Sequence, residues 1–269
     1  MSSNPGPKQP SKRAVRAPNI PTVELLGANV YVGDVGSAAR SLIDLAFAGS
    51  GGYACLFNAH VSVEASRNRS LASAIRRAAL VLPDGWPVAK LARYYAGQGD
   101  RIAGADLMER AIDIGRRDSV RHAFFGSNPE TLAAITDRLA SRYPGAQIVG
   151  RVAPPLFGVD ELERTQLHVD EIREHHPHIL WCGLGAPKQE LWMAKYSTAL
   201  APTVAVGVGA AFNFIARPEL RAPLWMQRAG LEWSYRLYRE PFRLIGRYSR
   251  TNSKFVLLAA SELRRRRTN

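Results

Sequence analysis

The chain has 269 residues, of which 46% are hydrophobic and 22% charged, and this composition excludes a wholly disordered protein. Two cysteines, Cys55 and Cys182, lie in apolar runs and cannot form a disulfide framework, so we expect reduced thiols that pack as small core residues. The formal net charge of +13 sits at the ends: residues 1–20 carry +4, residues 217–269 carry thirteen Lys and Arg against four Glu, and residues 21–216 are neutral. A neutral body with cationic ends is unlike a nucleic-acid-binding fold, which carries its basic surface on the folded face.

Residues 1–20 lack the apolar segment of a secretory signal, so we expect a disordered basic tail. After this tail, short apolar runs alternate with segments of helical period. The expected strands are residues 23–32, 53–57, 80–83, 120–125, 146–152, 179–184 and 203–208, and the expected helices are 37–49, 60–79, 129–142, 160–175, 187–199 and 210–216. This alternation predicts an α/β body over 21–216: a Rossmann-like, mostly parallel sheet with helices on both faces.

The uncharged stretch from Tyr196 to Ala216 is long enough to span a bilayer. It contains Pro202, Gly207 and Gly209, however, and is better explained as a helix end, a buried strand, a glycine turn and a short helix. We therefore predict no membrane-spanning segment there.

Residues 217–269 predict a basic helical appendage. Arginines recur every three or four residues and share one side of a helix, namely Arg236, Arg239, Arg243, Arg247 and Arg250. Pro241 suits a first helical turn and indicates two helices, 223–239 and 241–258. Aromatic residues interleaved with these arginines suit an anionic membrane surface, and the alternative is a solvated basic face packed on the body. We expect the run Arg264–Arg267 to be a solvated end.

Polar residues follow several of the predicted strands. Because ligands of such sheets bind at the carboxyl ends of the strands, we expect these side chains to meet in one crevice. They are Asn58, His60, Asp84, Ser127, Asn128, Lys188, Gln189, Glu190 and Asn213.

The string GLGAPKQE, residues 183–190, suggests an anion site after a buried strand. Gly185 lets the backbone approach a ligand, Pro187 leaves free amides at a helix start, and Lys188 adds a charge. Gly207 and Gly209 repeat the arrangement after the next strand and could supply a second set of amides. Neither a dinucleotide fingerprint nor a P-loop is present, and an ordinary tight turn is the alternative.

Asp84 lies in a turn, PDGWPV, where a carboxylate could be a general base, a ribose ligand or a helix cap. In RIAGAD, Arg101 and Gly104 precede Asp106, for which an N-cap beside a surface arginine is the alternative. Three histidines at 175–178 have no further ligands in register, so we predict a cationic helix end and no metal site. The metal-holding D-x-D element of many sugar transferases is missing, so amides and arginines would have to hold a nucleotide diphosphate.

Several strings together resemble the WecG/TagA/CpsF family of bacterial glycosyltransferases, glycosyltransferase family twenty-six. They are FNAH, the PDG turn, RIAGADL, GLGAPKQELW, GVGAAFNF and the long string over 221–248, and the likeness runs from about residue 23 to about residue 250. The resemblance implies an inverting, metal-independent enzyme without a cofactor. Such an enzyme moves a sugar (N-acetylmannosamine, its uronic acid or glucose) from a UDP-sugar to a polyprenyl-diphosphate-linked sugar, and its C-terminal appendage reaches the membrane.

By the same resemblance, Asp84 matches the general base, and Asn58, Arg101 and Gln189 match polar active-site positions. Arginines of the appendage would contact the leaving diphosphate, and the candidates are Arg221, Arg228 and Arg236. Some members carry a threonine where this chain has Leu56, so sugar preference here could differ.

We therefore expect a peripheral protein at the inner face of the cytoplasmic membrane that serves cell-surface polysaccharide synthesis, and homo-oligomer formation is left open. The rival hypothesis is a basic nucleic-acid-binding protein with a non-catalytic α/β body, motivated by the charge and the interleaved arginines and aromatics.

Overall fold

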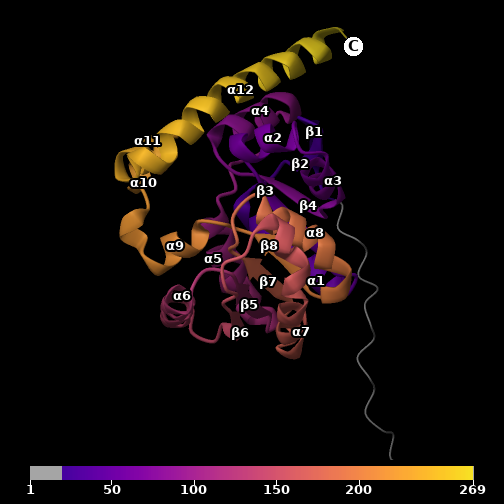
Figure 1. Ribbon diagram of the computed structural model, residues 1–269, viewed down its shortest axis with the longest axis vertical. Helices are drawn as coiled ribbons and strands as arrows, with labels where there is room; N and C mark the ends of the chain where they lie inside the picture. The colour runs from indigo at the N-terminus through magenta and orange to yellow at the C-terminus, as the bar shows by residue number, and fades with distance from the viewer. Residues whose placement is uncertain (1–19, 269) are drawn as a thin grey trace, which may run out of the picture.

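The computed structural model describes residues 20–268 (Figure 1). Within this range, only the backbone is described for residues 243, 244, 247–250, 267 and 268. The predicted tail over 1–20 lies outside the described residues apart from Ile20. Within the described range, one eight-stranded sheet has the order β1-β2-β4-β3-β8-β7-β5-β6. Its strands are β1 (Thr22–Leu25), β2 (Ala28–Tyr31), β3 (Gly52–Phe57), β4 (Leu80–Pro83), β5 (Arg121–Phe125), β6 (Gln147–Val152), β7 (Ile179–Cys182) and β8 (Val204–Gly207). All neighbouring strands are parallel except β1 and β2, so the predicted Rossmann-like sheet is confirmed.

Helices cover both faces of this sheet. The alternation of β3 shows it: Ala54 and Leu56 belong to a core cluster with α1, α5, α6 and α9, whereas Tyr53 and Cys55 pack with α7 and α8 on the other face. The bounds of these helices are α1 (Val35–Ala48), α5 (Gly104–Gly115), α6 (Pro129–Arg142), α7 (Gln166–Glu174), α8 (Lys188–Leu200) and α9 (Ala211–Ala216). Asn128, one of the strand-end residues, caps α6 by accepting a hydrogen bond from Thr131 N.

The first predicted strand is wrong in one respect. Residues 23–32 form an antiparallel hairpin, β1 and β2, rather than one strand. Leu26 and Gly27 turn the chain with positive φ angles of 52° and 77°. A two-residue turn of this kind matches the twist of paired strands, and the glycine at its second position tolerates the left-handed backbone.

Two predicted helices are also interrupted. Residues 60–79 form α2 (Ala59–Ala65) and α3 (Arg69–Arg77), because Asn68 caps a new helix by accepting from Leu71 N. Residues 160–175 begin as a 3₁₀ helix, Val159–Thr165, and continue as α7. The remaining helix of the body, α4 (Trp86–Ala96), follows the Asp84 turn.

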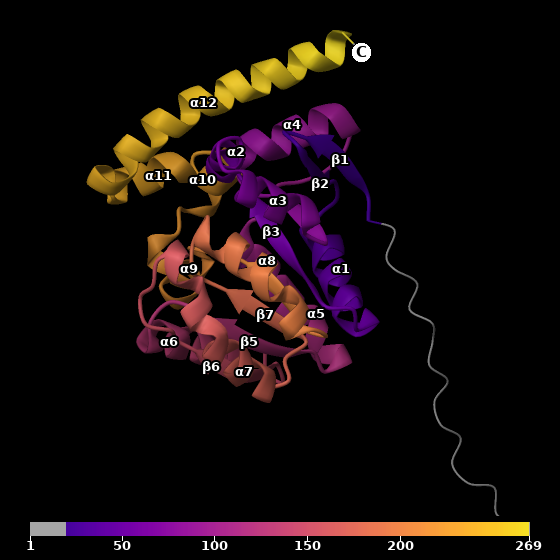
Figure 2. The ribbon, with the colours of Figure 1, turned by 45° about the vertical axis from the view of Figure 1, so that its right-hand side comes forward.

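The appendage, residues 217–268, crosses the edge of the body that carries α2 and α4 (Figure 2). The expected helix 223–239 is two helices, α10 (Leu224–Ala229) and α11 (Glu232–Arg239), because Gly230 adopts the left-handed conformation and ends α10. The second expected helix begins at Pro241 as predicted but runs to Thr268 as α12. Helix α12 packs on α2, and Phe255 is buried with Val61 and Val63. The side chains of Arg243, Arg247 and Arg250 lie outside the described residues, so the predicted arginine stripe is described only at Arg236 and Arg239.

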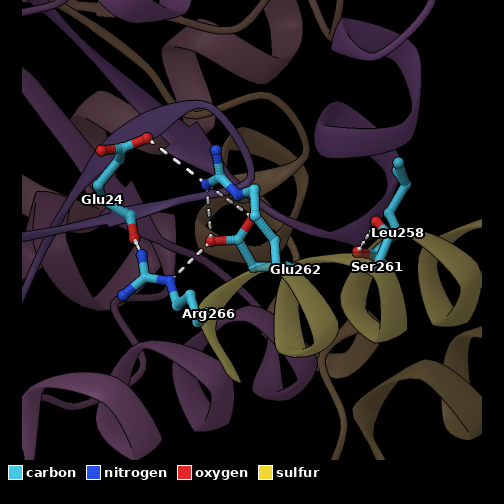
Figure 3. Close-up of polar contacts among 6 residues, drawn as sticks. Glu24, Leu258, Ser261, Glu262 and Arg266 are labelled. Atoms are coloured by element: carbon cyan, nitrogen blue, oxygen red, sulfur yellow. Dashed lines mark hydrogen bonds and ion pairs between the residues drawn. The ribbon is translucent and has the colours of Figure 1, made fainter. Parts of the chain in front are cut away.

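The far end of α12 is anchored on the first strand (Figure 3). Glu262 is buried and pairs with Arg265 and Arg266 at 3.1 and 2.8 Å. Arg266 also donates to the backbone oxygen of Glu24 and lies 4.1 Å from the centre of the Tyr95 ring. The expectation of a solvated end at Arg264–Arg267 is therefore wrong for Arg266, which fastens the helix to β1 and α4, whereas Arg265 is 56% exposed, as expected.

The interpretation of the uncharged stretch 196–216 is confirmed, since it forms the end of α8, strand β8 and helix α9. No described helix is long and apolar enough to cross a membrane. Both cysteines are buried and free, and burial raises the pKa of each thiol, as expected of core residues.

Candidate active site

Asn58 and Asp84 lie side by side because β3 and β4 are neighbours and each residue follows its strand directly. Asn58 caps α2: its Oδ1 atom accepts from His60 N and Val61 N, both at 3.0 Å. This fixes the amide orientation, so Nδ2 donates to Asp84 Oδ2 at 3.2 Å. The Asp84 backbone is held by its own N–H, which donates to Phe57 O at 3.0 Å. The site therefore begins with a carboxylate whose orientation is set by the helix-capping asparagine.

Asp84 has a raised pKa. Burial is the main cause, and the neighbouring Glu232 carboxylate adds to it, whereas the hydrogen bond from Asn58 and the charges of Arg101 and Arg236 act in the opposite direction. The helix-cap alternative is wrong, because α4 begins after Gly85 and no side chain caps it. A half-buried carboxyl with a raised pKa at the carboxyl end of a strand has the environment of a general base.

Arg101 is held beside Asp84 by the backbone, since Ile102 N donates to Pro83 O at 2.8 Å. Its guanidinium donates to Glu232 of α11 at 2.7 Å, and the two side chains are only 13% and 16% exposed. Arg101 is thus not the surface arginine of the alternative reading. The pair joins the body to the appendage at the mouth of the site.

A second ion pair also joins the body to the appendage, but here the appendage supplies the arginine and the body supplies the acid. Arg221 of the appendage lies 2.7 Å from Asp106, which sits in the first turn of α5. The N-cap of α5 is Ala103, so the N-cap reading of Asp106 is wrong. Two further guanidinium atoms of Arg221, Nε and Nη2, are buried and have no hydrogen-bond partner within the described part of the chain. The hydrogen-bonding capacity of these two charged donors is therefore unused among the described residues.

The appendage closes on the site at two further points. Trp86, two residues after Asp84, donates from its indole to Gln227 O at 2.9 Å. Arg236 lies over the Phe214 ring at 5.4 Å. Arg228, the remaining arginine candidate, is exposed on α10. Sequence reasoning missed Glu232, Trp86 and Gln227; the available signal was a glutamate within an otherwise basic and aromatic stretch.

The GLGAPKQE residues build a buried polar chain rather than an open loop of amides. Gln189 accepts from Gly185 N at 3.1 Å and donates to Glu190 Oε1 at 2.8 Å. Glu190 is fully buried, which raises its pKa to about 7. The chain packs directly against the Gly207 backbone, since a Cβ there would lie 2.9 Å from Gln189 Nε2. The Gly185 amide is therefore already occupied by Gln189.

Other candidates have structural partners. Lys188 donates to Phe157 O at 2.9 Å and lies over that ring, and Gly209 N donates to Cys182 O at 3.4 Å. Gly104 starts α5 directly against Leu56, since a Cβ at Gly104 would lie 2.7 Å from Leu56 Cδ1. Leu56 is thus a buried core residue. Binding roles for Lys188, Gly104 and Gly209 stay predictions.

Among the residues that the structure describes, no group of three or more His, Cys, Asp or Glu side chains could hold a metal ion. Two of the histidines at 175–178 have structural contacts: the His175 backbone caps the end of α7, and His178 accepts from Arg121 N at 3.0 Å. His178 is thus engaged with β5 next to its own strand.

Comparison with known proteins gives a consistent result. The profile described as "Glycosyl transferase WecG/TagA/CpsF family" matches residues 23–269. Two similar proteins, from Bacillus spizizenii (strain ATCC 23059 / NRRL B-14472 / W23) and Bacillus subtilis (strain 168), are both named N-acetylglucosaminyldiphosphoundecaprenol N-acetyl-beta-D-mannosaminyltransferase. The first is 30% identical over 72% of this chain and 73% of its own, and the second is 26% identical over 69% and 71%. A Staphylococcus aureus (strain MW2) protein of the same name is 27% identical over 68% and 70%. With a match across the whole described body and appendage, the chain belongs to the WecG/TagA/CpsF family of glycosyltransferases.

Proposed function

We propose that this enzyme moves a sugar, with inversion, from a UDP-sugar to a sugar carried on a polyprenyl diphosphate. The observation that carries the proposal is Asp84, a half-buried carboxylate held by Asn58 and flanked by Arg101 and Arg236. The names of the relatives favour N-acetylmannosamine as the transferred sugar and N-acetylglucosaminyl-diphosphoundecaprenol as the acceptor.

In the proposed reaction, Asp84 accepts the proton of the acceptor hydroxyl as that oxygen attacks the anomeric carbon of the donor. The bond from this carbon to the phosphate oxygen breaks, and its electron pair leaves with UDP. A single displacement at one carbon inverts its configuration. A base with a pKa above the ordinary carboxyl range suits this proton transfer.

Negative charge grows on the departing diphosphate, and arginines are the groups available to balance it. Arg221 has two buried donors free within the described residues, and Arg101 and Arg236 lie near Asp84. Fixed guanidinium donors that are shielded from water stabilise such charge well. We therefore propose transfer without a divalent metal, which predicts an unchanged rate in excess EDTA.

We propose further that the appendage brings the site to the inner face of the cell membrane. Its exposed apolar side chains lie among basic residues and include Leu224, Trp225, Leu231, Trp233, Tyr238, Phe242 and Ile245. Amphipathic aromatic residues and arginines together suit the headgroup region of anionic lipid. The expected result is co-sedimentation with vesicles containing anionic lipid and much weaker binding to neutral vesicles.

The deciding experiment measures UDP release from a panel of UDP-sugars, with and without a short polyprenyl-diphosphate-linked N-acetylglucosamine. Release from one donor that depends on the lipid acceptor supports the proposal. Equal release with and without acceptor would indicate a hydrolase instead.

The family match favours this function over nucleic-acid binding. Titration with a labelled oligonucleotide at physiological salt tests that rival, which requires tight binding that weakens steeply with salt. Self-association stays a prediction and is measured by analytical ultracentrifugation.

A further inference from the structure

Glu232 is an unusual residue for its surroundings. It lies in the first turn of α11, where a carboxylate is favoured by the helix dipole, but it faces the body rather than solvent. Its Oε2 atom accepts from Arg101 Nη1 at 2.7 Å, and both side chains are mostly buried. The two side chains depend on each other, because removing one leaves the charge of the other uncompensated in a poorly solvated place.

The backbone of Arg101 is fixed independently of this pair. Ile102 N donates to Pro83 O, so the residue before it is held next to the Asp84 turn whether or not the appendage is docked. Among the side chains that the structure describes, Glu232 is the hydrogen-bond and ion-pair partner that directs the Arg101 guanidinium. Glu232 therefore determines where the Arg101 charge lies within the site.

The same carboxylate balances charge around Asp84. The polar and charged groups that act on Asp84 are Asn58 and Arg101 of the body and Glu232 and Arg236 of α11. The two arginines and Asn58 favour the ionised carboxylate, whereas burial and Glu232 oppose ionisation. Without Glu232, two arginines would act on Asp84 without compensation, and the carboxylate would be a weaker base.

We propose that Glu232 is a positioning residue of the transfer reaction: it holds the Arg101 guanidinium at the site and offsets the arginine charge around Asp84. This inference rests on the proposed function.

The test compares Glu232→Gln with Glu219→Gln, the same change at an exposed glutamate of the appendage. Carbon NMR of the aspartate side chains, with Asp84→Asn to assign the signal, follows the titration of Asp84 directly. We expect a lower pKa of Asp84 in Glu232→Gln and the wild-type value in Glu219→Gln. In the UDP-release assay, the acid limb of kcat/KM should move to lower pH and the plateau should fall about 10- to 100-fold.

Glu232→Asp separates the effect of the negative charge from the effect of side-chain length. It keeps the negative charge, so the acid limb should return toward its wild-type position, while the shorter side chain still lowers the plateau. If Glu232→Gln does not fold, Glu232→Asp alone decides the question. A kcat/KM plateau equal to that of the wild type in Glu232→Asp overturns the inference.

The two proposals fail differently. An unchanged Asp84 titration in a folded, active Glu232→Gln enzyme overturns the role of Glu232 and leaves the transferase function standing. The opposite result is a shifted Asp84 titration in Glu232→Gln together with a wild-type chain that releases no UDP from any donor. That result supports the coupling between Glu232 and Asp84 and overturns the proposed function.

Discussion

Asp84→Asn is the substitution that separates catalysis from structure most cleanly. Asparagine has nearly the same shape and keeps an oxygen that can accept the hydrogen bond from Asn58 Nδ2. It cannot accept a proton as a carboxylate does. We therefore expect an intact fold and a damaged reaction.

The expected loss of activity is large. A positioned general base contributes about 10²- to 10⁴-fold in rate, which corresponds to about 2.7–5.4 kcal/mol of transition-state stabilisation. The loss should appear in kcat, because the donor and acceptor still meet the same arginines. KM should change by less than about threefold if those contacts carry the binding.

Stability should move in the opposite direction. The pKa of Asp84 in the folded protein lies above its ordinary value of 3.8, mainly because of burial. The folded state therefore binds the proton more tightly, and the stabilisation from protonated Asp84 is lost as pH rises through the folded pKa. At pH 7 the variant, which carries no charge to desolvate, should be at least as stable as the wild type, and this difference should vanish as the pH falls to about 4.

The measurements are UDP release with the lipid acceptor and urea unfolding at pH 7 and pH 4. A variant that retains more than about a tenth of the wild-type kcat would refute the assignment of Asp84 as general base. A variant that is clearly less stable at pH 7 would refute the account of its raised pKa.

Three further results are expected. Phe255→Ala should lower the free energy of unfolding by about 3 kcal/mol, because this ring is only 8% exposed, whereas Val256→Ala at a 63% exposed position should change it by less than about 0.5 kcal/mol; urea titrations compare them. Arg221→Ala should reduce kcat/KM about 10- to 100-fold by removing the charged donors beside Asp106, and Arg217→Ala, at an exposed arginine, is the control in the same assay. Burial and a neighbouring histidine lower the pKa of His122 to about 3, so the folded state keeps this ring neutral while the unfolded chain protonates it below about pH 6.5. Its stabilising effect is therefore lost as the pH falls from 6.5 toward 3, by up to about 1.4 kcal/mol per unit, and His122→Gln should flatten the pH dependence of unfolding in that range.

The local part of the site could be predicted from the sequence. Apolar runs followed by polar residues identified Asn58 and Asp84, because strand ends are visible as a change in hydrophobicity. Their contact depends on β3 lying next to β4, a property of strand order that no local pattern encodes. Breaks within predicted helices were missed where a short cap, such as Asn68, restarts the helix within an otherwise continuous helical pattern.

The long-range part could not be predicted from residue patterns. Glu232 meets Arg101 across 131 positions, and Gln227 meets Trp86 across 141. The appendage as a whole is strongly positive, and this net charge gave no indication that one of its few acids, Glu232, faces the site. Similarly, the charge of Lys188 predicts an anion ligand, but residue patterns do not reveal that its ammonium donates to the Phe157 carbonyl and lies over the Phe157 ring.

Helix α2 links the appendage a second time to Asp84, the proposed general base. Its first turn is capped by Asn58, the donor to Asp84, and its buried face receives Phe255 of α12. The helix has seven residues and is about 10 Å long, so both events occur on one short rigid element. Thermodynamic linkage then makes the coupling mutual: any free energy by which lipid contact on α12 favours binding of the donor near the Asp84 site must equally strengthen lipid contact once the donor is bound. An enzyme built this way would hold its soluble substrate most tightly while it is at the surface where the other substrate resides.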